Sequence, residues 1–125
     1  EVRILGTDYP TPDGTCVRDY IHVTDLASAH VVGLQALLAG SVESQPINLG
    51  TGKGYSVREV VEAVQRITKS SFRVTEGPRR EGDPPELVAA VDRARTTLGW
   101  KAELSDLDQM IASAWDWHRR RFAHR

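Results

Sequence analysis

Apolar residues recur at helical spacing in several stretches of the chain, so that each stretch would present one hydrophobic face. The first predicted helix is capped by Thr24 or Asp25 and ends near Gly40. The next begins after Ser56, which has the spacing of a capping box with Glu59. The apolar positions expected to be buried on these two helices are Leu26, Ala29, Val32, Ala36 and Leu37, and Val57, Val60, Val61, Val64 and Ile67.

Two further helices are predicted toward the C-terminus. Asp92 caps a short helix over residues 93–98, which Gly99 closes in the left-handed conformation. Ser105 opens the last helix. The predicted packing face of this helix carries Leu107, Met110, Ile111, Ala114, Trp117 and His118. Its arginine-rich end, residues 118–121, matches the helix dipole and is predicted to be solvated rather than to bind nucleic acid.

Short apolar and β-branched runs predict strands between these helices. The runs are residues 2–5, 20–23, 46–49, 72–74 and 87–91, the last of them expected to be a buried strand. Loops rich in glycine, aspartate and proline cover residues 6–15 and 77–85. Short strands that alternate with about four helices predict a small α/β fold.

Composition limits the possible functions. A chain of 125 residues that is 40% hydrophobic and 26% charged fits one globular domain. Its net charge of -1 provides no field that would attract nucleic acid or a membrane surface. The single cysteine, Cys16, and the lack of a signal peptide or long apolar span indicate a reducing compartment, by default the cytoplasm. Because the chain opens at Glu1 directly in a strand pattern, we expect residues 1–125 to be a fragment, with apolar surface of that first strand exposed.

Arginine and aspartate occur close together in two turn-rich stretches that are far apart in the sequence. One contains Arg18 and Asp19, and the other contains Arg80 and Asp83. Planar guanidinium groups fit phosphate oxygens in pairs, so two separated arginines can clamp a pyrophosphate while carboxylates orient them or bind hydroxyl groups. This pattern suggests a nucleotide-sugar. The alternative is two surface ion-pair clusters with little effect on stability.

The glycine-rich loop at residues 50–54 is like a nucleotide-binding loop but departs from both known patterns. The third glycine of a dinucleotide fingerprint would fall at Tyr55, whose large ring does not allow close helix–strand packing. A P-loop is also excluded, because Lys53 is followed by Gly54 rather than by serine or threonine. We interpret the loop as a tight turn before a helix.

The spacing of the reactive side chains predicts no catalytic, cofactor-binding or metal residue in this chain. No tyrosine is followed four residues later by a lysine, the pair that would lower the pKa of a phenol for acid/base work. His22 and His30 are not spaced as zinc ligands, and Cys16 has no partner set. We expect His22 to be packed or hydrogen-bonded.

In its order of motifs, the chain resembles the C-terminal part of UDP-glucose 4-epimerases, which belong to the extended short-chain dehydrogenase/reductase group. The motifs are GTCVRDYIHV (14–23), DLA (25–27), INLG (47–50) and RREGD (79–83). The resemblance implies that residues 1–125 form the UDP-sugar-binding portion of a homodimeric isomerase whose N-terminal Rossmann domain is absent from this chain. NAD on that absent half would oxidise and re-reduce sugar C4 of UDP-glucose or UDP-galactose.

The resemblance also implies roles for individual residues. Arg18 and Arg80 would hold the UDP phosphates, Tyr20 would line the nucleotide pocket, and Asp83 would accept hydrogen bonds from ribose hydroxyl groups. The uracil would lie along the first strand at Leu5, where many relatives carry an aromatic residue. Leucine at that position leaves more of the base binding to backbone hydrogen bonds.

Leu87 stands where the family has a residue that borders the sugar. A tyrosine there crowds out an N-acetyl group at C2, so the shorter leucine would also admit UDP-N-acetylhexosamines. The alternative is that Leu87 only begins a buried strand and never meets the substrate.

Two other functions stay open. One is the same region of a related nucleotide-sugar dehydratase or decarboxylase, although the RREGD motif favours an epimerase. The other is a free-standing phosphate-binding or interaction module without an enzymatic role, against which the abrupt opening strand argues. In either enzymatic case the chain by itself is expected to be inactive.

Overall fold

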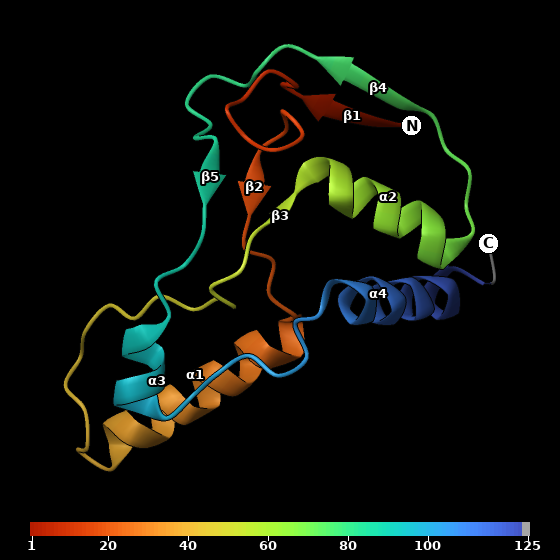
Figure 1. Ribbon diagram of the computed structural model, residues 1–125. Coiled ribbons are helices and arrows are strands. Elements are labelled where there is room, and N and C mark those ends of the chain that lie inside the picture. Colours follow the sequence, from red (N-terminus) through yellow and green to blue (C-terminus); the bar gives the residue numbers. More distant parts are fainter. Residues whose placement is uncertain (124–125) are drawn as a thin grey trace.

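Short strands and helices alternate along the computed structural model, which describes residues 1–123 (Figure 1). In chain order the elements are β1 (Val2–Leu5), β2 (Val17–Arg18), α1 (Val23–Leu38), β3 (Tyr55–Ser56), α2 (Val57–Thr68), β4 (Val74–Gly77), β5 (Glu86–Leu87), α3 (Asp92–Leu98) and α4 (Leu107–Phe122). This arrangement confirms the predicted small α/β fold.

The strands form two small sheets. In the first, β1 and β4 run parallel, with Leu5 opposite Gly77. In the second, β2 is central, antiparallel to β3 and parallel to β5. Arg18 on β2 therefore lies between Tyr55 on one side and Leu87 on the other.

The helices pack in two pairs at different ends of the molecule (Figure 1). α2 contacts α4 below the sheets, and α3 contacts α1 at the far end. Ala29 of α1, Ala94 of α3 and Trp100 form a buried cluster. The indole N–H of Trp100 donates to Ser28 Oγ at 2.8 Å, so the polar edge of this ring is also satisfied.

Several predicted helix ends are confirmed. The N–H of Glu59 donates to Ser56 Oγ at 3.0 Å and the N–H of Ser56 donates to Glu59 Oε2 at 2.6 Å, which completes the capping box of α2. α3 ends at Gly99 with a left-handed φ of 62°. α1 ends at Leu38, close to the predicted Gly40.

The predicted apolar faces are buried to different degrees. All five predicted positions on α2 are partly buried. On α1, Ala29 is buried but Leu37 is 48% exposed. On α4, Leu107 is buried, whereas Trp117 is 63% exposed and His118 is exposed. The prediction of a packed face is wrong at Leu37, Ala114 and Trp117, which are exposed, whereas the exposure of His118 agrees with the solvated helix end predicted for residues 118–121.

The predicted caps of α1 and α4 are wrong by one to three residues. His22, rather than Thr24 or Asp25, caps α1, because its Nδ1 accepts the N–H of Thr24 at 3.0 Å. Asp106, rather than Ser105, caps α4. Asp25 and Ser105 bind each other instead: Ser105 Oγ donates to Asp25 Oδ2 at 2.6 Å and ties the start of α4 to α1.

Two predicted strands are not found in the part of the chain that the structure describes. Residues 20–23 follow the end of β2, and there the N–H of His22 donates to Ser105 Oγ at 2.8 Å as the chain turns into α1. Residues 46–49 form a loop, and they pair with no strand within residues 1–123. A strand needs such a neighbour for its backbone hydrogen bonds.

Three other boundaries differ from the prediction. The strand expected at 72–74 begins two residues later, where its pairing with β1 begins. The strand expected at 87–91 is reduced to β5, and Leu87 is 62% exposed instead of buried. Asp92 is the first residue of α3, whose N-cap Val91 makes no side-chain hydrogen bond.

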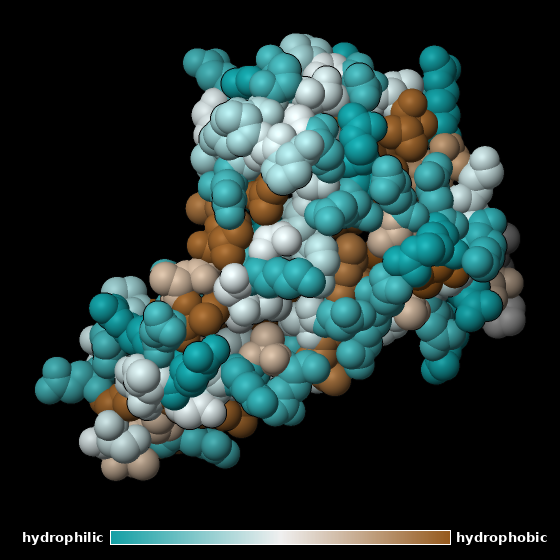
Figure 2. All heavy atoms as spheres, viewed as in Figure 1, coloured by the Kyte–Doolittle hydropathy of each residue, from teal (hydrophilic) through white to brown (hydrophobic). Residues whose placement is uncertain are grey.

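Hydrophobic side chains are exposed at several places on the surface. Val2 and Leu5 on β1 are 39% and 40% exposed, as expected, and Leu34 and Leu38 on α1 are more exposed still. Figure 2 shows hydrophobic residues gathered on the face beside β5. Within residues 1–123, no helix has both the length and the apolar character of a membrane span.

Candidate functional site

Two arginines from distant parts of the chain meet at one carboxylate. Asp83 Oδ1 lies 2.7 Å from Arg80 Nη2 and 3.7 Å from Arg18 Nη2. Arg18 comes from β2, whereas Arg80 and Asp83 lie in the loop between β4 and β5. The structure thus brings together three of the predicted site residues, which we call the arginine cluster.

The Arg18 side chain is fixed by the backbone on both sides of it. Its Nη1 donates to the carbonyl oxygens of Val17 at 2.7 Å and of Pro84 at 3.0 Å. The Arg18 side chain is 23% exposed, and that of Arg80 is 68% exposed. Because a guanidinium group has five N–H donors, these bonds occupy only part of each arginine.

The turn that returns Asp83 to Arg80 depends on Gly82. Gly82 has a φ of +83°, which glycine adopts without strain, and the N–H of Asp83 donates to the carbonyl of Arg80 at 3.3 Å. The hydrogen bond from Arg80, supported by the charges of Arg80 and Arg18, holds the pKa of Asp83 below its usual value. The carboxylate is therefore ionised at neutral pH.

Arg79 fixes the same loop from its other side. Its guanidinium lies over the Tyr9 ring, 4.3 Å from the ring centroid, and its Nε donates to Asp8 Oδ1 at 2.7 Å. The RREGD motif contains Arg79, but sequence reasoning did not identify Asp8 and Tyr9 as its partners. No local sequence pattern indicates this contact, because Asp8 and Arg79 are 71 residues apart.

The remaining predicted site residues lie at different distances from the arginine cluster. Leu87 is opposite Arg18 in the register of β2 and β5. Tyr20 is half-buried, and burial raises the pKa of its phenol while the charge of Arg18 opposes that rise. Leu5 is opposite Gly77, so pairing places it at the start of the loop rather than within the cluster.

Asp19 holds three segments together. Its Oδ1 accepts the N–H and hydroxyl of Thr51 at 2.9 and 2.7 Å, and its Oδ2 accepts the N–H groups of Gly52 at 2.9 Å and Ala89 at 3.2 Å. The sequence suggested that an aspartate beside Arg18 orients the arginines or binds ligand hydroxyl groups. Asp19 is instead occupied by the protein's own backbone.

The histidine singled out in the sequence is hydrogen-bonded, as predicted. His22 Nε2 lies 2.9 Å from Ser113 Oγ, and its Nδ1 accepts the N–H of Thr24. Within residues 1–123 there is no group of three or more His, Cys, Asp or Glu side chains placed to hold a metal ion.

Sequence comparison finds UDP-glucose 4-epimerases among the relatives of this chain, although no family model matches it. The UDP-glucose 4-epimerase of Rhizobium meliloti (strain 1021) is 51% identical over 119 residues, which cover 95% of this chain and 36% of that protein. The UDP-glucose 4-epimerase of Lacticaseibacillus casei is 47% identical over 117 residues, covering 94% of this chain and 35% of the relative. The chain therefore spans about a third of the length of the curated relatives it matches.

Solved structures agree with this result. The enzyme from Stenotrophomonas maltophila, with bound NAD and formylated UDP-arabinopyranose, matches all of this chain and 37% of its own length, with a TM-score of 0.92 and 45% identity. The Bifidobacterium longum enzyme with NAD+ and UDP matches 98% of this chain and 36% of its own length, with a TM-score of 0.82 and 42% identity. The chain matches the C-terminal part of UDP-glucose 4-epimerases.

These epimerase structures contain NAD, but the glycine-rich loop at residues 50–54 of this chain does not fit the phosphates of that cofactor. In a dinucleotide-binding loop, backbone N–H groups point at the phosphates. Here the N–H groups of Thr51 and Gly52 donate to the carboxylate of Asp19, which would repel a phosphate. The loop at 50–54 is a turn before β3 and α2, as predicted from the bulky Tyr55.

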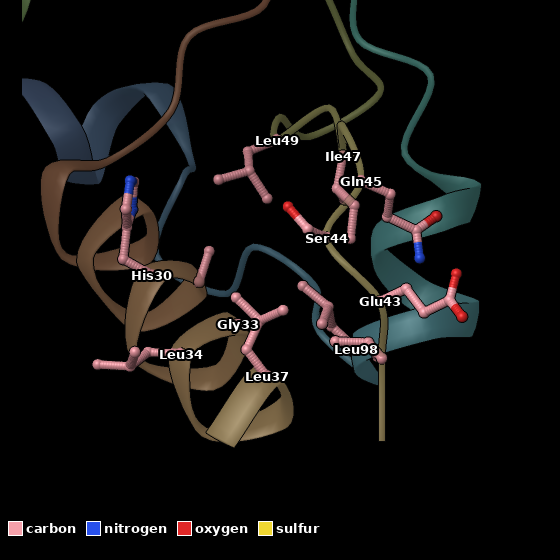
Figure 3. Close-up of a pocket in the computed structure, with 12 residues that line it drawn as sticks. His30, Gly33, Leu34, Leu37, Glu43, Ser44, Gln45, Ile47, Leu49 and Leu98 are labelled. Carbon is pink, nitrogen blue, oxygen red and sulfur yellow. The ribbon is translucent and has the colours of Figure 1, made fainter. Parts of the chain in front are cut away.

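An apolar pocket lies away from the residues with expected epimerase roles. It has a volume of about 340 Å³ and is formed by α1, α3 and the loop that follows α1 (Figure 3). Leu37 lines it from α1, Ile47 and Leu49 from the loop, and Leu98 from α3. No arginine lines this pocket, so the arginine cluster is the better candidate for binding a diphosphate.

Proposed function

We propose that this chain is the UDP-sugar-binding part of a UDP-glucose 4-epimerase. The observation that carries the proposal is the convergence of Arg18 and Arg80 on Asp83. It is supported by the match to about a third of the epimerase length and by structural neighbours crystallised with UDP or UDP-glucose. Under this proposal the chain anchors UDP while the sugar reacts in the complete protein.

The arginine cluster suits a diphosphate because it presents two cationic forks near one another. Each guanidinium can donate paired hydrogen bonds to phosphate oxygens. Asp83 balances the charge of both arginines and so keeps Arg18 and Arg80 from repelling each other. As an ionised carboxylate it is also an acceptor for ribose hydroxyl groups.

The part of the proposed site that would hold the nucleoside offers both an apolar and a polar side chain. The phenol of Tyr20 is protonated at neutral pH, and burial raises its pKa further, so it offers a hydroxyl donor. Leu5, 40% exposed on β1, offers apolar area to the uracil. These two roles are the finer part of the proposal.

The catalytic contribution of this chain is orientation. A diphosphate held at fixed arginines brings the sugar repeatedly to the same place, which lowers the entropic cost of the reaction. In the proposed enzyme NAD, bound outside this chain, supplies the hydride chemistry at sugar C4. The chain by itself should then neither bind NAD nor interconvert UDP-glucose and UDP-galactose, and turnover by purified residues 1–125 would contradict the proposal.

The decisive experiment is calorimetric titration of UDP into the complete protein that carries this chain. Arg18→Ala or Arg80→Ala should weaken binding by roughly 2 to 4 kcal/mol, since each removes charge-assisted hydrogen bonds to a desolvated phosphate. Arg80→Lys should rescue little, because a compact ammonium does not reproduce the paired donors.

Arg66→Ala is the matched control. Arg66 also forms an ion pair at the surface, donating to Asp108 at 2.8 and 2.6 Å, but it joins α2 to α4 away from the cluster. Its removal should leave UDP affinity unchanged. The arginine cluster is not a diphosphate site if the wild-type protein does not bind UDP, or if Arg66→Ala and Arg80→Ala weaken UDP binding equally.

A further inference from the structure

Arg79 precedes Arg80 in the loop between β4 and β5, but its side chain bonds in another direction. Its Nε donates to Asp8 Oδ1 at 2.7 Å, and its Nη2 donates to the carbonyl oxygen of the same residue. Its guanidinium carbon lies 4.3 Å from the centroid of the Tyr9 ring. Both partners of Arg79 therefore belong to the loop that follows β1, whereas Arg80 pairs with Asp83 inside its own loop.

The Tyr9 ring is a fixed support for this guanidinium. Tyr9 is 5% exposed, and its N–H donates to the carbonyl of Gly14 at 2.9 Å, which closes the loop on itself. Gly6 lies against the ring, because a Cβ added there would overlap Tyr9 Cε2 and lie 2.9 Å from Arg79 Cγ. The N–H of Gly6 donates to the carbonyl of Gly77 at 2.9 Å. Ring and guanidinium are thus stacked at the place where both loops leave the β1–β4 sheet.

The loop after β1 is itself anchored to the elements that carry Arg18. Asp13 Oδ1 accepts the N–H and the hydroxyl of Thr15 at 2.8 and 2.7 Å, and the hydroxyl of Ser56 donates to Asp13 Oδ2. Ser56 belongs to β3, which pairs with β2. A side chain that bonds to this loop is therefore bonded to the framework of Arg18.

We propose that Arg79 is a positioning residue, which holds the loop of Arg80 at the separation from Arg18 that a diphosphate requires. This inference rests on the proposed function, and Arg79 itself touches no phosphate in it. When the arginine cluster turns from Asp83 to a phosphate, the bonds of Arg79 still hold the loop. A site arranged in advance in this way binds its ligand without first having to order the loop.

The test is calorimetric titration of UDP into the complete protein. Arg79→Ala should weaken binding about fivefold, the scale of one surface ion pair together with one cation–π contact. Calorimetry also gives the number of sites, so a variant that folds only in part shows fewer sites rather than weaker ones. Arg58→Ala is the matched control: Arg58 also joins distant segments, with its Nη2 3.0 Å from Glu76 Oε1 of β4, and its loss should leave the affinity unchanged.

A double-mutant cycle separates positioning from direct binding. If Arg79 acts through Arg80, then adding Arg79→Ala to Arg80→Ala should weaken UDP binding by less than about twofold, because the group that Arg79 places is already missing. If Arg79 bound the phosphate itself, the two losses would multiply, and the positioning role would be overturned.

Conservative variants give a further readout. Arg79→Lys should bind UDP within about twofold of the wild type, because an ammonium also stacks on a ring: Lys53 Nζ lies 4.7 Å from the Tyr55 ring centroid. At Arg80, where paired donors are needed, lysine should rescue little. Tyr9→Leu removes the ring and should weaken binding as Arg79→Ala does, and Tyr9→Phe, which restores the ring, should recover the affinity.

The outcomes separate this inference from the proposed function. A wild-type protein that does not bind UDP contradicts both. If the wild type binds UDP and Arg80→Ala weakens that binding, while Arg79→Ala changes the affinity by less than twofold, the positioning role of Arg79 alone is overturned. An equal loss of affinity in Arg58→Ala and Arg79→Ala has the same meaning.

Discussion

Asp25 and Asp83 have the same side chain and opposite surroundings. Asp25 is 4% exposed and accepts the N–H of Leu104 at 2.8 Å and the hydroxyl of Ser105 at 2.6 Å. Asp83 faces Arg80 and Arg18 at the surface. Burial raises the pKa of Asp25, but the bonds from Ser105 and from the backbone outweigh it and lower the pKa overall.

The difference separates a buried structural carboxylate from the carboxylate of the proposed binding site. Asp25 is bonded to groups that nothing else in the described structure satisfies, so its loss leaves buried donors unpaired. The closer partner of Asp83 is Arg80, whose side chain is 68% exposed and which water can hydrate, so this pair contributes little to folding. The arginines of the cluster are able to exchange a carboxylate for a phosphate, which the donors around Asp25 are not.

The largest expected effect is a loss of folding stability when the buried carboxylate of Asp25 is removed. Asp25→Ala should lower the free energy of unfolding by about 3 kcal/mol, because the N–H of Leu104 and the hydroxyl of Ser105 lose their buried acceptor. Urea denaturation measures the change. Asp116→Ala is the control, since Asp116 forms ion pairs with exposed Arg119 and Arg120. A similar loss of stability in both variants would show that buried Asp25 contributes no more to folding than exposed Asp116.

Lowering the pH should reduce the difference in the free energy of unfolding between the wild type and Asp25→Asn. The folded-state pKa of Asp25 is lowered, so its ionised form stabilises the fold above the unfolded pKa of about 3.9, and this stability is lost as pH falls through the lower folded value. Asparagine does not titrate. Unfolding free energies measured from pH 7 to pH 2 should therefore differ most near neutral pH and converge below pH 4. A gap that widens in acid would show that Asp25 is protonated in the folded protein.

The sequence predicted elements whose signal is local and missed contacts that join distant residues. Helical periodicity and the Ser56–Glu59 spacing identified α1 and α2, because both depend on neighbours within one or two turns. Asp25 looked like a helix cap, but its main partner, Ser105, is 80 residues away. The strand expected at 46–49 has the right composition but no neighbouring strand within residues 1–123.

The candidate site was predicted for a different reason. Arg18, Arg80 and Asp83 were identified by motif and resemblance, and the structure brings them together. Asp19 was named in the same motif, but its partners were not predicted. Nothing in the spacing indicated that Thr51 and Ala89 would approach it from separate segments.

A smaller effect is expected at Leu87, which lies opposite Arg18 in the register of β2 and β5. In the complete protein, Leu87→Tyr should lower the preference for UDP-N-acetylgalactosamine over UDP-galactose by about 1 kcal/mol, the value of one methyl-sized contact. The ratio of the two kcat/KM values measures this change. Because Leu87 is 62% exposed, the substitution should leave stability nearly unaltered. An unchanged ratio would mean that Leu87 does not border the sugar.

The smallest effect is the stability change from Arg80→Ala. The Arg80 side chain is 68% exposed, and its pair with Asp83 is exchanged for water at little cost, so the free energy of unfolding should be nearly unchanged. The same variant should lose most of its affinity for UDP, as argued above. Urea denaturation and UDP titration of one preparation therefore give opposite results at Arg80, whereas Asp25→Asn should change stability and leave the affinity of the folded protein for UDP intact. If Arg80→Ala unfolds as readily as Asp25→Ala, the arginine cluster holds the loop between β4 and β5 in place, and its effect on UDP is then a consequence of folding.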